Sequence, residues 1–517
     1  PCAQGGSDPD TLGLQALWRA YLACRKGKRN TRDAQQYESH LLDGLVHARD
    51  ALASASWRPS PLLCFVVRQP KLREIHAAPF ADRVVHHLLV ERLARLYEPI
   101  FIHDSYANRK GKGTLAAVER LQQFARSLGG AGAALTANKQ AQHPHSFGAT
   151  APPAASLAQP GGGYYLQLDI ANFFNRIHRP TLFRLLQQRL ARAVRRQGVA
   201  SDEARMLQTL CRALLQGNPA DGARRKGPPG HFAAVPQHKR LAGQERGRGL
   251  PIGNLTSQFF ANVYLNELDQ FIKHRLKACY YLRYVDDFVL LHHSPAQLLA
   301  WRDAIEGFLR EHLGLQLKER TPPRPIVTGM DFLGYIVRPH YRLVRRRTVR
   351  RMHSVLTAFA RCHVHAQGLV LPRAARERLR AQVASYRAQF AHAASARLWQ
   401  RTVARFPWLG QVFSNAATPP GAGPLRPAWQ PASISGVASQ YRYFAQQHPQ
   451  ACVLMQVGKY WLLPLSEGSA HAALGGALRV HQPGLGQCLA WRSRHVPRLR
   501  QRLKQRGTAH VLVAQDG

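Results

Sequence analysis

The chain has 517 residues, with 72 Lys or Arg against 29 Asp or Glu, which gives a net charge of +43. This charge makes a polyanion the expected partner, and a content of 45% hydrophobic and 9% aromatic residues excludes a disordered basic tail. The eight cysteines are scattered without a C-x-x-C pair, and no apolar run approaches membrane-spanning length. We therefore expect a cytoplasmic protein of several domains with reduced structural thiols, no zinc ligands and no membrane segment.

Basic residues follow the first predicted strand. Residues 62–67 are apolar, which favours a strand, and Lys71 and Arg73 come soon after it. These cations can hold phosphate groups or belong to a generic basic strand. A helix begins near Pro79, because proline is favoured in the first helical turn. A second basic segment, Ser-Tyr-Ala-Asn-Arg-Lys-Gly-Lys-Gly, contains Arg109.

An acid ends the next predicted strand. Residues 164–169 alternate in character as a strand does, and Asp169 lies at its end. Phe173 and Phe174 follow in a helix or turn, and the pattern alone does not tell which ring packs in the core. Before this strand, residues 129–163 are rich in Gly, Ala, Pro and Gln, which indicates an insertion without a core.

A glycine-rich turn precedes another helix. The sequence Gly-Leu-Pro-Ile-Gly ends at Gly253, and it lets the backbone approach a bound group closely. Apolar residues between 259 and 268 predict a helix, with Ser257 and Gln258 in its first turn. Residues 217–248, before the turn, are basic and loop-like.

Two adjacent acids, Asp286 and Asp287, lie between apolar segments that predict a hairpin with strands at 280–284 and 288–291. Carboxylates at a tight turn between buried strands repel each other, so cations stabilise them, and oxygen ligands suit Mg²⁺. A plain turn without metal is the alternative. With Asp169, three acids from separate segments match the ligand set of a two-metal phosphoryl-transfer site.

The motif series resembles that of reverse transcriptases across residues 60–340, above all in Tyr-Val-Asp-Asp at 284–287. The resemblance implies an α+β fold, a right-hand polymerase with fingers, palm and helical thumb. Asp169, Asp286 and Asp287 are then catalytic. Together with Ile170 they are expected to hold two Mg²⁺ ions, with Mn²⁺ as a substitute.

The resemblance also implies roles around the nucleotide. Phe174 matches the bulky gate that excludes a ribose 2′-hydroxyl, which implies a preference for deoxynucleotides. Arg320, with Lys318 as its neighbour, matches a basic residue that protonates departing pyrophosphate, although arginine hardly titrates. Tyr284 is expected to contact nucleic acid. The implied nucleotide-binding residues are Lys71, Arg73, Arg109, Phe174, Gly253, Ser257 and Gln258.

Ile252 departs from the usual pattern, since most reverse transcriptases have Gln at this position and Pro where Gln258 stands. The Ile-Gly-Asn-Leu-Thr-Ser-Gln version resembles the enzymes of diversity-generating retroelements, in which loss of this Gln permits misincorporation opposite template adenine. The implied protein is a bacterial RNA-directed DNA polymerase. Its partners are template RNA, the cDNA/RNA duplex, dNTPs and a basic accessory protein. Retron, group II intron and phage-defence reverse transcriptases are alternatives, as is a catalytically silent nucleic-acid-binding module.

Residues 341–412 carry fifteen Arg, no Lys and a single acid, Glu377. A stretch with charges of one sign indicates phosphate contact, so we expect a helical thumb after the fingers and palm of residues 1–340. A linker rich in Pro and Gly spans 413–432. The candidate nucleic-acid-binding residues of the thumb are Arg345, Arg346 and Arg347.

Residues 433–517 predict a small α/β domain in the order helix, strand, basic helix (489–506) and strand. Its Gln-Tyr, His-Pro and Gly-x-Tyr motifs resemble the N-terminal mismatch-recognition domain of MutS. Tyr460 occupies the place of the stacking Phe of that family, and Leu462 replaces its Glu. Ten Lys or Arg against two acids suggest duplex binding, with a structural or RNA-docking role as the alternative.

Overall fold

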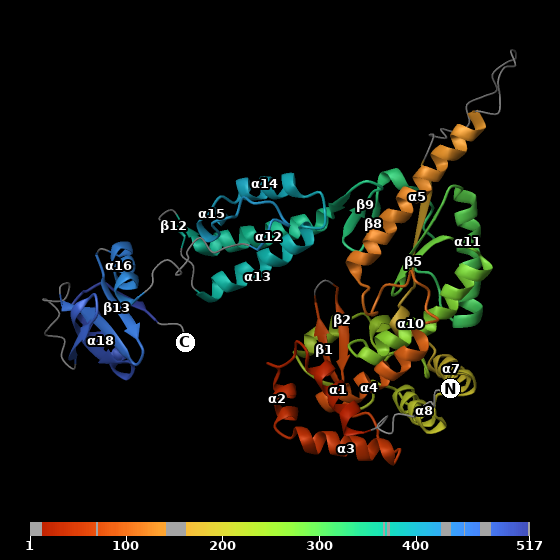
Figure 1. The fold of residues 1–517 in the computed structure, drawn as a ribbon, viewed down its shortest axis with the longest axis horizontal. Coiled ribbons are helices and arrows are strands. Elements are labelled where there is room, and N and C mark those ends of the chain that lie inside the picture. The colour runs from red at the N-terminus through yellow and green to blue at the C-terminus, as the bar shows by residue number, and fades with distance from the viewer. Residues whose placement is uncertain are drawn as a thin grey trace, which may run out of the picture. The chain divides into compact units, whose positions relative to one another are not determined.

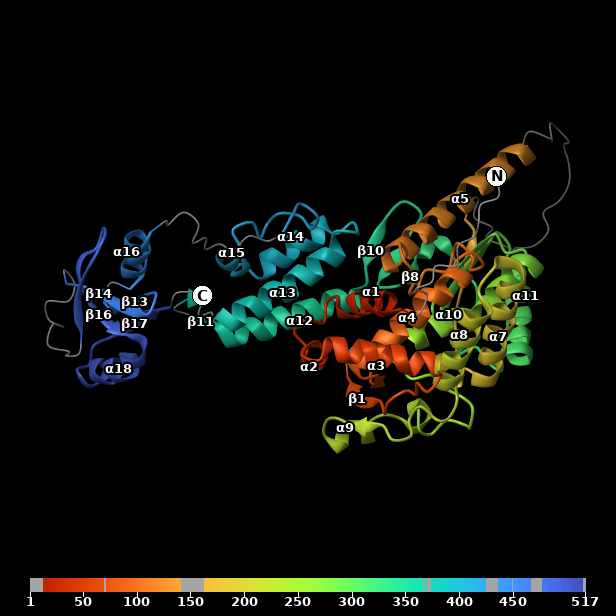
Figure 2. The same ribbon diagram turned by 60° about the horizontal axis from the view of Figure 1, so that its bottom comes forward.

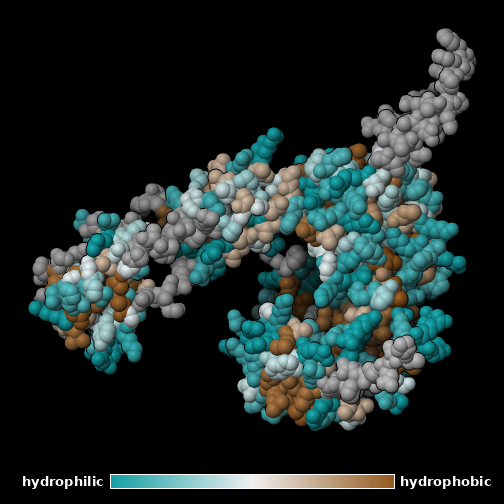
Figure 3. All heavy atoms as spheres, viewed as in Figure 1, coloured by the Kyte–Doolittle hydropathy of each residue, from teal (hydrophilic) through white to brown (hydrophobic). Residues whose placement is uncertain are grey.

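The computed structural model divides into two compact units (Figure 1). Unit 1 comprises residues 1–351 and 392–394, and unit 2 comprises 352–391 and 395–517. No helix in the described part of the chain is both long and apolar enough to cross a bilayer. Figure 3 shows hydrophilic residues over most of the visible surface. The structure describes residues 13–68, 71–140, 162–365, 368–369, 373–424, 436–448, 450–465 and 477–514, with backbone alone for 130–140, 365, 368, 373 and 447.

Helices and a small sheet form the N-terminal part of unit 1. They are α1 (Leu14–Arg25), α2 (Arg32–Glu38), α3 (Leu41–Ala53), β1 (Leu63–Val67), β2 (Arg73–Ala77), α4 (Phe80–Tyr97) and β4 (Arg224–Arg225). Leu17, Tyr21 and Leu89 are buried in one apolar cluster, in which α1 packs on α4. The strand expected at 62–67 is confirmed as β1, which pairs antiparallel with β2 and parallel with β4. The helix expected near Pro79 is confirmed as α4.

A four-stranded sheet in the order β5-β6-β3-β7 organises the rest of unit 1. The sheet and its covering elements are β3 (Tyr164–Asp169), β5 (Tyr280–Tyr284), β6 (Asp287–His292), β7 (Arg324–Pro325), α5 (Thr114–Gln140), α10 (Leu255–Gln270), α11 (Pro295–Phe308), β8 (Met330–Phe332) and β9 (Tyr335–Val337). Because side chains alternate along a strand, Phe288 packs on one face with α10 and α11, and Val289 packs on the other with α5, β8 and β9. The hairpin predicted around Asp286 is confirmed.

The two predicted insertions are more ordered than the sequence suggested. Helix α5 continues to Gln140, so residues 129–140 are helical and not a coreless loop, while residues 141–161 lie outside the described part. Within 217–248, β4 extends the β1–β2 sheet, and a short helix α9 (Pro229–Ala233) follows. Helices α7 and α8, which precede residues 217–248 in the chain, lie side by side (Figures 1 and 2). The remaining elements of unit 1 are α6 (Phe173–Arg176), α7 (Arg179–Gln197), α8 (Ser201–Leu215), η1 (Gln237–Lys239), η2 (Phe271–Arg275), η3 (Leu309–Leu313), η4 (Ile326–Thr328) and β10 (Arg342–Val344).

The first half of unit 2 is helical, as expected for 341–412, except that residues 342–344 form β10 in a sheet of unit 1. Trp399 lies at the centre of these helices, and its Nε1 donates a hydrogen bond to the carbonyl oxygen of Ala416 at 2.8 Å. The Arg387 guanidinium lies 5.0 Å from the Trp399 ring centroid and joins this core. The elements are α12 (Arg346–His363), β11 (Val364–His365), β12 (Gly368–Leu369), α13 (Arg373–Phe390), α14 (Ala396–Arg405) and α15 (Leu409–Val412).

The C-terminal part of unit 2 is a small α/β domain, as predicted, but it contains more strands than expected. Its elements are α16 (Val437–Gln447), β13 (Cys452–Val457), β14 (Tyr460–Pro464), β15 (Leu478–Gln482), β16 (Gly486–Arg492), η7 (Ser493–His495), α18 (Val496–Gln505) and β17 (His510–Val513). The sheet order is β15-β16-β14-β13-β17. Residues 489–492 were expected to begin the basic helix, yet they belong to β16. The reason is that Trp491 pairs with Trp461 in the sheet and both pack in its core.

The turn between β5 and β6 has a strained backbone. It consists of Val285 and Asp286, because Tyr284 pairs with Asp287 across the hairpin. Val285 has a φ of 58°. This conformation is rare for a β-branched residue and costs about 1–3 kcal/mol, so the surrounding structure must stabilise it.

Arg283 supplies this stabilisation. Its side chain is fully buried, and its Nη1 donates a hydrogen bond to the Val285 carbonyl oxygen at 3.0 Å. Its other donors reach Asn262, Ser105 and both carboxylate oxygens of Asp269, the shortest at 2.6 Å. All five guanidinium N–H groups therefore have acceptors, and burial leaves none of them unsatisfied.

We expect Asp269→Asn to lower the free energy of unfolding by about 3 kcal/mol or more, because it leaves the buried Arg283 charge unpaired. Urea unfolding followed by tryptophan fluorescence measures the change. The matched control, Glu91→Gln, removes an exposed i,i+4 ion pair with Arg95 and should cost no more than about 0.5 kcal/mol. Equal effects of the two substitutions would contradict the assigned role of the buried pair.

Candidate active site

Three carboxylates meet at one end of the β3–β6 pair. Asp169 lies directly opposite Asp287 in the register, so both side chains project from the same face of the sheet. Gln167 shares that face, and its Nε2 donates a hydrogen bond to Asp287 Oδ1 at 3.0 Å. Asp286 lies on the adjoining turn. The three acids singled out from the sequence are thus brought together from two distant segments.

The acids line a cleft of about 450 Å³. Lys71 and Arg73, both exposed, line the same cleft, and their positive charges partly offset the rise that burial causes in the pKa of Asp286. The cleft therefore combines carboxylates, which can bind divalent cations, with basic groups that can bind phosphate. Its other lining residues include Tyr165, Gln167, Tyr284, Lys318, Arg324 and Asp331.

Asp286 and Asp287 are weak acids. Burial is the main cause, and together with the nearby Asp169 carboxylate it raises the pKa of Asp286 to about 6 and that of Asp287 to about 7. Deprotonating all three acids places like charges in a poorly solvated site, and a divalent cation relieves this repulsion. The oxygen ligands fit Mg²⁺, which prefers carboxylates and water to nitrogen or sulfur ligands.

The segment 316–318 runs beside the end of β3. The Lys318 backbone N–H donates to the Asp169 carbonyl oxygen at 2.8 Å, and the Ala171 backbone N–H donates to the Gln316 carbonyl oxygen at 2.9 Å. These two hydrogen bonds flank Ile170, and neither uses its carbonyl oxygen. The position of Ile170 is therefore compatible with a backbone ligand next to Asp169.

The same pairing places Lys318, and not Arg320, beside the acids. Lys318 Nζ lies 3.7 Å from Asp169 Oδ2. Arg320, which the sequence pattern favoured, instead pairs with Asp303 and Glu306 at 2.9 and 2.8 Å. The geometry therefore favours Lys318 over Arg320 as the basic residue near the acids, because Lys318 lines the cleft and Arg320 is not among its lining residues.

Arg109 does not belong to the cleft. Its side chain is only 7% exposed and forms an ion pair with Glu98 at 2.8 Å. It also donates hydrogen bonds to the carbonyl oxygens of Ile102 and Ser105 at 2.7 and 3.1 Å. These contacts fold the guanidinium into its own loop, so the geometry does not support the expected contact with nucleotide phosphates.

The other expected nucleotide-binding residues are not among those that line the cleft. Ser257 is buried and lines a separate cavity of about 190 Å³. Gln258 is half-buried and Gly253 is exposed. For the phenylalanine pair the structure decides what the sequence left open: Phe173 is buried in the core, and Phe174 is only partly buried.

The expected nucleic-acid-binding residues have different environments. Tyr284 lines the cleft, and its hydroxyl lies 3.2 Å from that of Thr114. Arg345 forms an ion pair with Asp331, whereas Arg346 and Arg347 are exposed at the start of α12. Tyr460, the candidate in the C-terminal domain, is half-buried at the start of β14.

Comparison with known proteins decides the family. The model of the family described as "Reverse transcriptase (RNA-dependent DNA polymerase)" matches residues 68–337, which is more than half of the chain. The chain belongs to the reverse transcriptase family. Its α+β fold is that of an RNA-directed DNA polymerase, and the family match implies this activity.

This reverse transcriptase is similar to Protein YkfC of Escherichia coli (strain K12), with 21% identity over 346 residues that cover 60% of this chain and 74% of the relative. Among solved structures it is similar to a truncated apo telomerase of Candida tropicalis, with a TM-score of 0.35 and 13% identity over 59% of this chain and 60% of that one. It also matches telomerase of Candida albicans bound to a fragment of telomeric RNA, with a TM-score of 0.34 and 11% identity over 64% and 54%. The matches thus span less than two thirds of these telomerase chains.

Sequence reasoning missed two features of the reverse transcriptase site. Gln167 orients Asp287, and its position two residues before Asp169 on the same predicted face was the available signal. The Asp269–Arg283 pair was also missed. A charged residue inside an apolar strand, and an acid inside an apolar helix, are rarely buried unless they are paired, and this could have been recognised.

The raised pKa values of Asp286 and Asp287 predict how stability depends on pH when divalent ions are removed. The folded state binds protons at these carboxyls more tightly than the unfolded chain, so their contribution is complete only below about pH 4, where the unfolded carboxyls are also protonated, and it is lost progressively as pH rises through about 6 to 7. We expect Asp287→Asn to raise the free energy of unfolding at pH 8 by about 2 kcal/mol more than it does at pH 4.

Urea unfolding in EDTA at both pH values measures this difference. Asp202→Asn, at an exposed acid of α8, is the control and should show no gain that depends on pH. An effect of Asp287→Asn on the free energy of unfolding that is the same at pH 8 and at pH 4 would contradict the proposed repulsion.

Proposed function

We propose that this reverse transcriptase synthesises cDNA on an RNA template with two Mg²⁺ ions held by Asp169, Asp286 and Asp287, with Mn²⁺ as a substitute. The ions would supply the charge that activates the primer 3′-hydroxyl and stabilises the departing pyrophosphate. The Ile170 carbonyl oxygen is a further ligand. Lys71 orients the incoming triphosphate through its charge.

The observation that carries this proposal is that three carboxylates and two basic side chains, Lys71 and Arg73, line one cleft. Arg73 can bind phosphate oxygens through two N–H groups at once. Lys318, beside Asp169, can donate a proton to pyrophosphate, which arginine does poorly. The partly buried Phe174 is the proposed gate against a ribose 2′-hydroxyl, which gives a preference for deoxynucleotides.

Primer extension on poly-rA with dTTP tests the function. We expect Asp286→Ala to reduce the rate by about 10³-fold or more, because it removes a charge that positions the phosphoryl-transfer site. Glu245→Ala, at an exposed acid outside the cleft, is the matched control and should keep nearly full activity. Equal activity of the wild type and Asp286→Ala would overturn the assignment, and an inactive wild type would favour the silent nucleic-acid-binding module.

We further propose that the enzyme is the error-prone type of diversity-generating retroelements, on the basis of Ile252. The His76 N–H donates to the Ile252 carbonyl oxygen at 2.7 Å, which fixes the turn against β2. Gly253 has a φ of 127°, and a Cβ there would lie 2.8 Å from the Ile75 side chain. The turn is thus tightly placed, and its partly exposed Ile252 side chain has no polar group with which to test a base pair.

Replacing Ile252 by Gln restores a polar side chain to this fixed turn. We expect Ile252→Gln to lower misincorporation opposite template adenine by about tenfold, because one added polar contact is worth about 1 to 1.5 kcal/mol. Sequencing of cDNA copied from a template of balanced composition measures the errors. Ile252→Leu, which stays apolar, should retain the wild-type error spectrum.

An error rate that is even across all four template bases in the wild type would contradict the diversity-generating type. It would favour a retron, group II intron or phage-defence enzyme.

We propose that the helical region 341–412 and the C-terminal domain bind the template–product duplex. Exposed Arg346 and Arg347 can contact phosphates. Helix α18 adds a basic surface, and Tyr460 begins the strand after a tight turn, where its ring could stack on a base. A basic accessory protein and a bacterial cytoplasmic location belong to the same proposal.

A further inference from the structure

The hairpin formed by β1 and β2 carries a second cluster of side chains that can bind a metal, separate from the acids of the cleft. Cys64 on β1 lies directly opposite His76 on β2, and Glu74 lies two residues before His76. Residues two apart on a strand project from the same face. The three side chains therefore share one face of the hairpin, and Arg73 and Ile75 of β2 project from the other.

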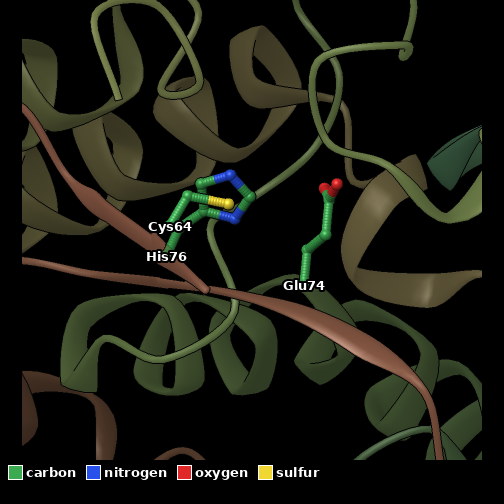
Figure 4. Close-up of side chains that lie close together, drawn as sticks. All are labelled: Cys64, Glu74 and His76. Carbon is green, nitrogen blue, oxygen red and sulfur yellow. The ribbon is translucent and has the colours of Figure 1, made fainter. Parts of the chain in front are cut away.

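The ligand atoms of this cluster are close together. The Cys64 sulfur, a ring nitrogen of His76 and a carboxylate oxygen of Glu74 all lie within 4.8 Å of one another. Figure 4 shows the three side chains rising from the same side of the two strands. One ion among them could therefore contact all three after small rotamer adjustments.

Two of the three side chains are buried, and the third is held by a backbone hydrogen bond. Cys64 and His76 are 4% and 3% exposed. The Glu74 Oε2 accepts the Leu241 backbone N–H at 3.2 Å, and this contact would orient Glu74 as an outer-shell contact orients a metal ligand.

The ligand types suit a soft or borderline cation, because they combine a thiol, an imidazole and a carboxylate. A bound metal ion displaces the thiol proton, and a thiolate with a carboxylate then balances two positive charges.

We propose that Cys64, Glu74 and His76 bind one divalent transition-metal ion of the zinc type, with water as the fourth ligand. Sulfur, nitrogen and oxygen ligands in one site favour zinc and disfavour Mg²⁺. A cavity of about 310 Å³ is lined by Glu74, Arg225 and Arg240 among others, so the Glu74 side of the cluster borders open space. This proposal departs from the sequence-based expectation that none of the cysteines is a zinc ligand.

The ion would act as a structural brace. It would link β1 to β2 on the face away from Arg73, and it would immobilise His76, whose backbone N–H holds the turn that contains Ile252. The site is therefore distinct from the Mg²⁺ cleft, and it does not depend on the proposed function, because its test measures metal content and not polymerisation.

The test uses the full chain, expressed with added zinc and dialysed against metal-free buffer, with zinc measured by mass spectrometry. We expect about one zinc per chain in the wild type. The same content is expected in the control Cys279→Ser, which alters an exposed cysteine. Cys64→Ser and His76→Ala should each lose at least nine tenths of the zinc. Glu74→Gln, a milder change, should weaken zinc binding at least tenfold in a chelator competition.

Cobalt substitution gives a second readout. Co²⁺ bound to the wild type and to Cys279→Ser should show a thiolate-to-cobalt charge-transfer band, and Cys64→Ser should lack it. If Cys64→Ser and His76→Ala fail to fold, Glu74→Gln and the wild-type cobalt spectrum still decide. A zinc-free wild type, zinc binding unchanged by Glu74→Gln, or a cobalt spectrum without the thiolate band would overturn the proposal.

Discussion

The buried pair of Arg283 and Asp269 is the interaction on which the end of the β5-β6-β3-β7 sheet that carries Asp169, Asp286 and Asp287 depends. Asp286 and Asp287 are presented by a two-residue turn that forces Val285 into a left-handed conformation, and an isolated hairpin would relax out of it. Arg283 opposes this by donating to the Val285 carbonyl oxygen while Asp269, on α10, neutralises its charge. The geometry of the turn is therefore determined by a helix and by a strand that carry none of the metal-binding acids.

The carboxylates of the cleft, in contrast, destabilise this end of the sheet. Burial and mutual repulsion raise their pKa values, so the site is least stable when it is deprotonated and free of cations. A rigid brace is needed because a softer turn would let the carboxylates move apart into water. Backbone strain and charge repulsion thus occur at one place, and a cation bound there would relieve the repulsion. The exposed Lys71 and Arg73, on the β1–β2 hairpin, provide positive charge that complements these carboxylates.

The sequence predicted those features that follow from local pattern. The β5–β6 hairpin was evident from apolar residues on both sides of two acids, and Asp169 was placed correctly at a strand end. Features set by long-range pairing were not predictable in this way. Lys318 reaches the cleft because its backbone pairs with Asp169, and Arg109 is withdrawn because Glu98 lies beside it. The strand at Trp491 looked helical because its tryptophan partner lies thirty residues earlier in the chain.

Strand β2 of the β1–β2 hairpin contributes both to the cleft, through Arg73, and to the cluster that we propose binds zinc, through Glu74 and His76. Its alternation sends Arg73 to the cleft and His76 to the opposite face, so the two faces carry different chemistry. They remain mechanically linked, because the His76 N–H holds the Ile252 carbonyl oxygen and Ile75 packs against Gly253. A change in the position of His76 is therefore transmitted to the turn whose side chain we propose to control base selection. The His76 hydrogen bond and the packing of Ile75 therefore link the face of the hairpin that carries Cys64, Glu74 and His76 to the turn at Ile252.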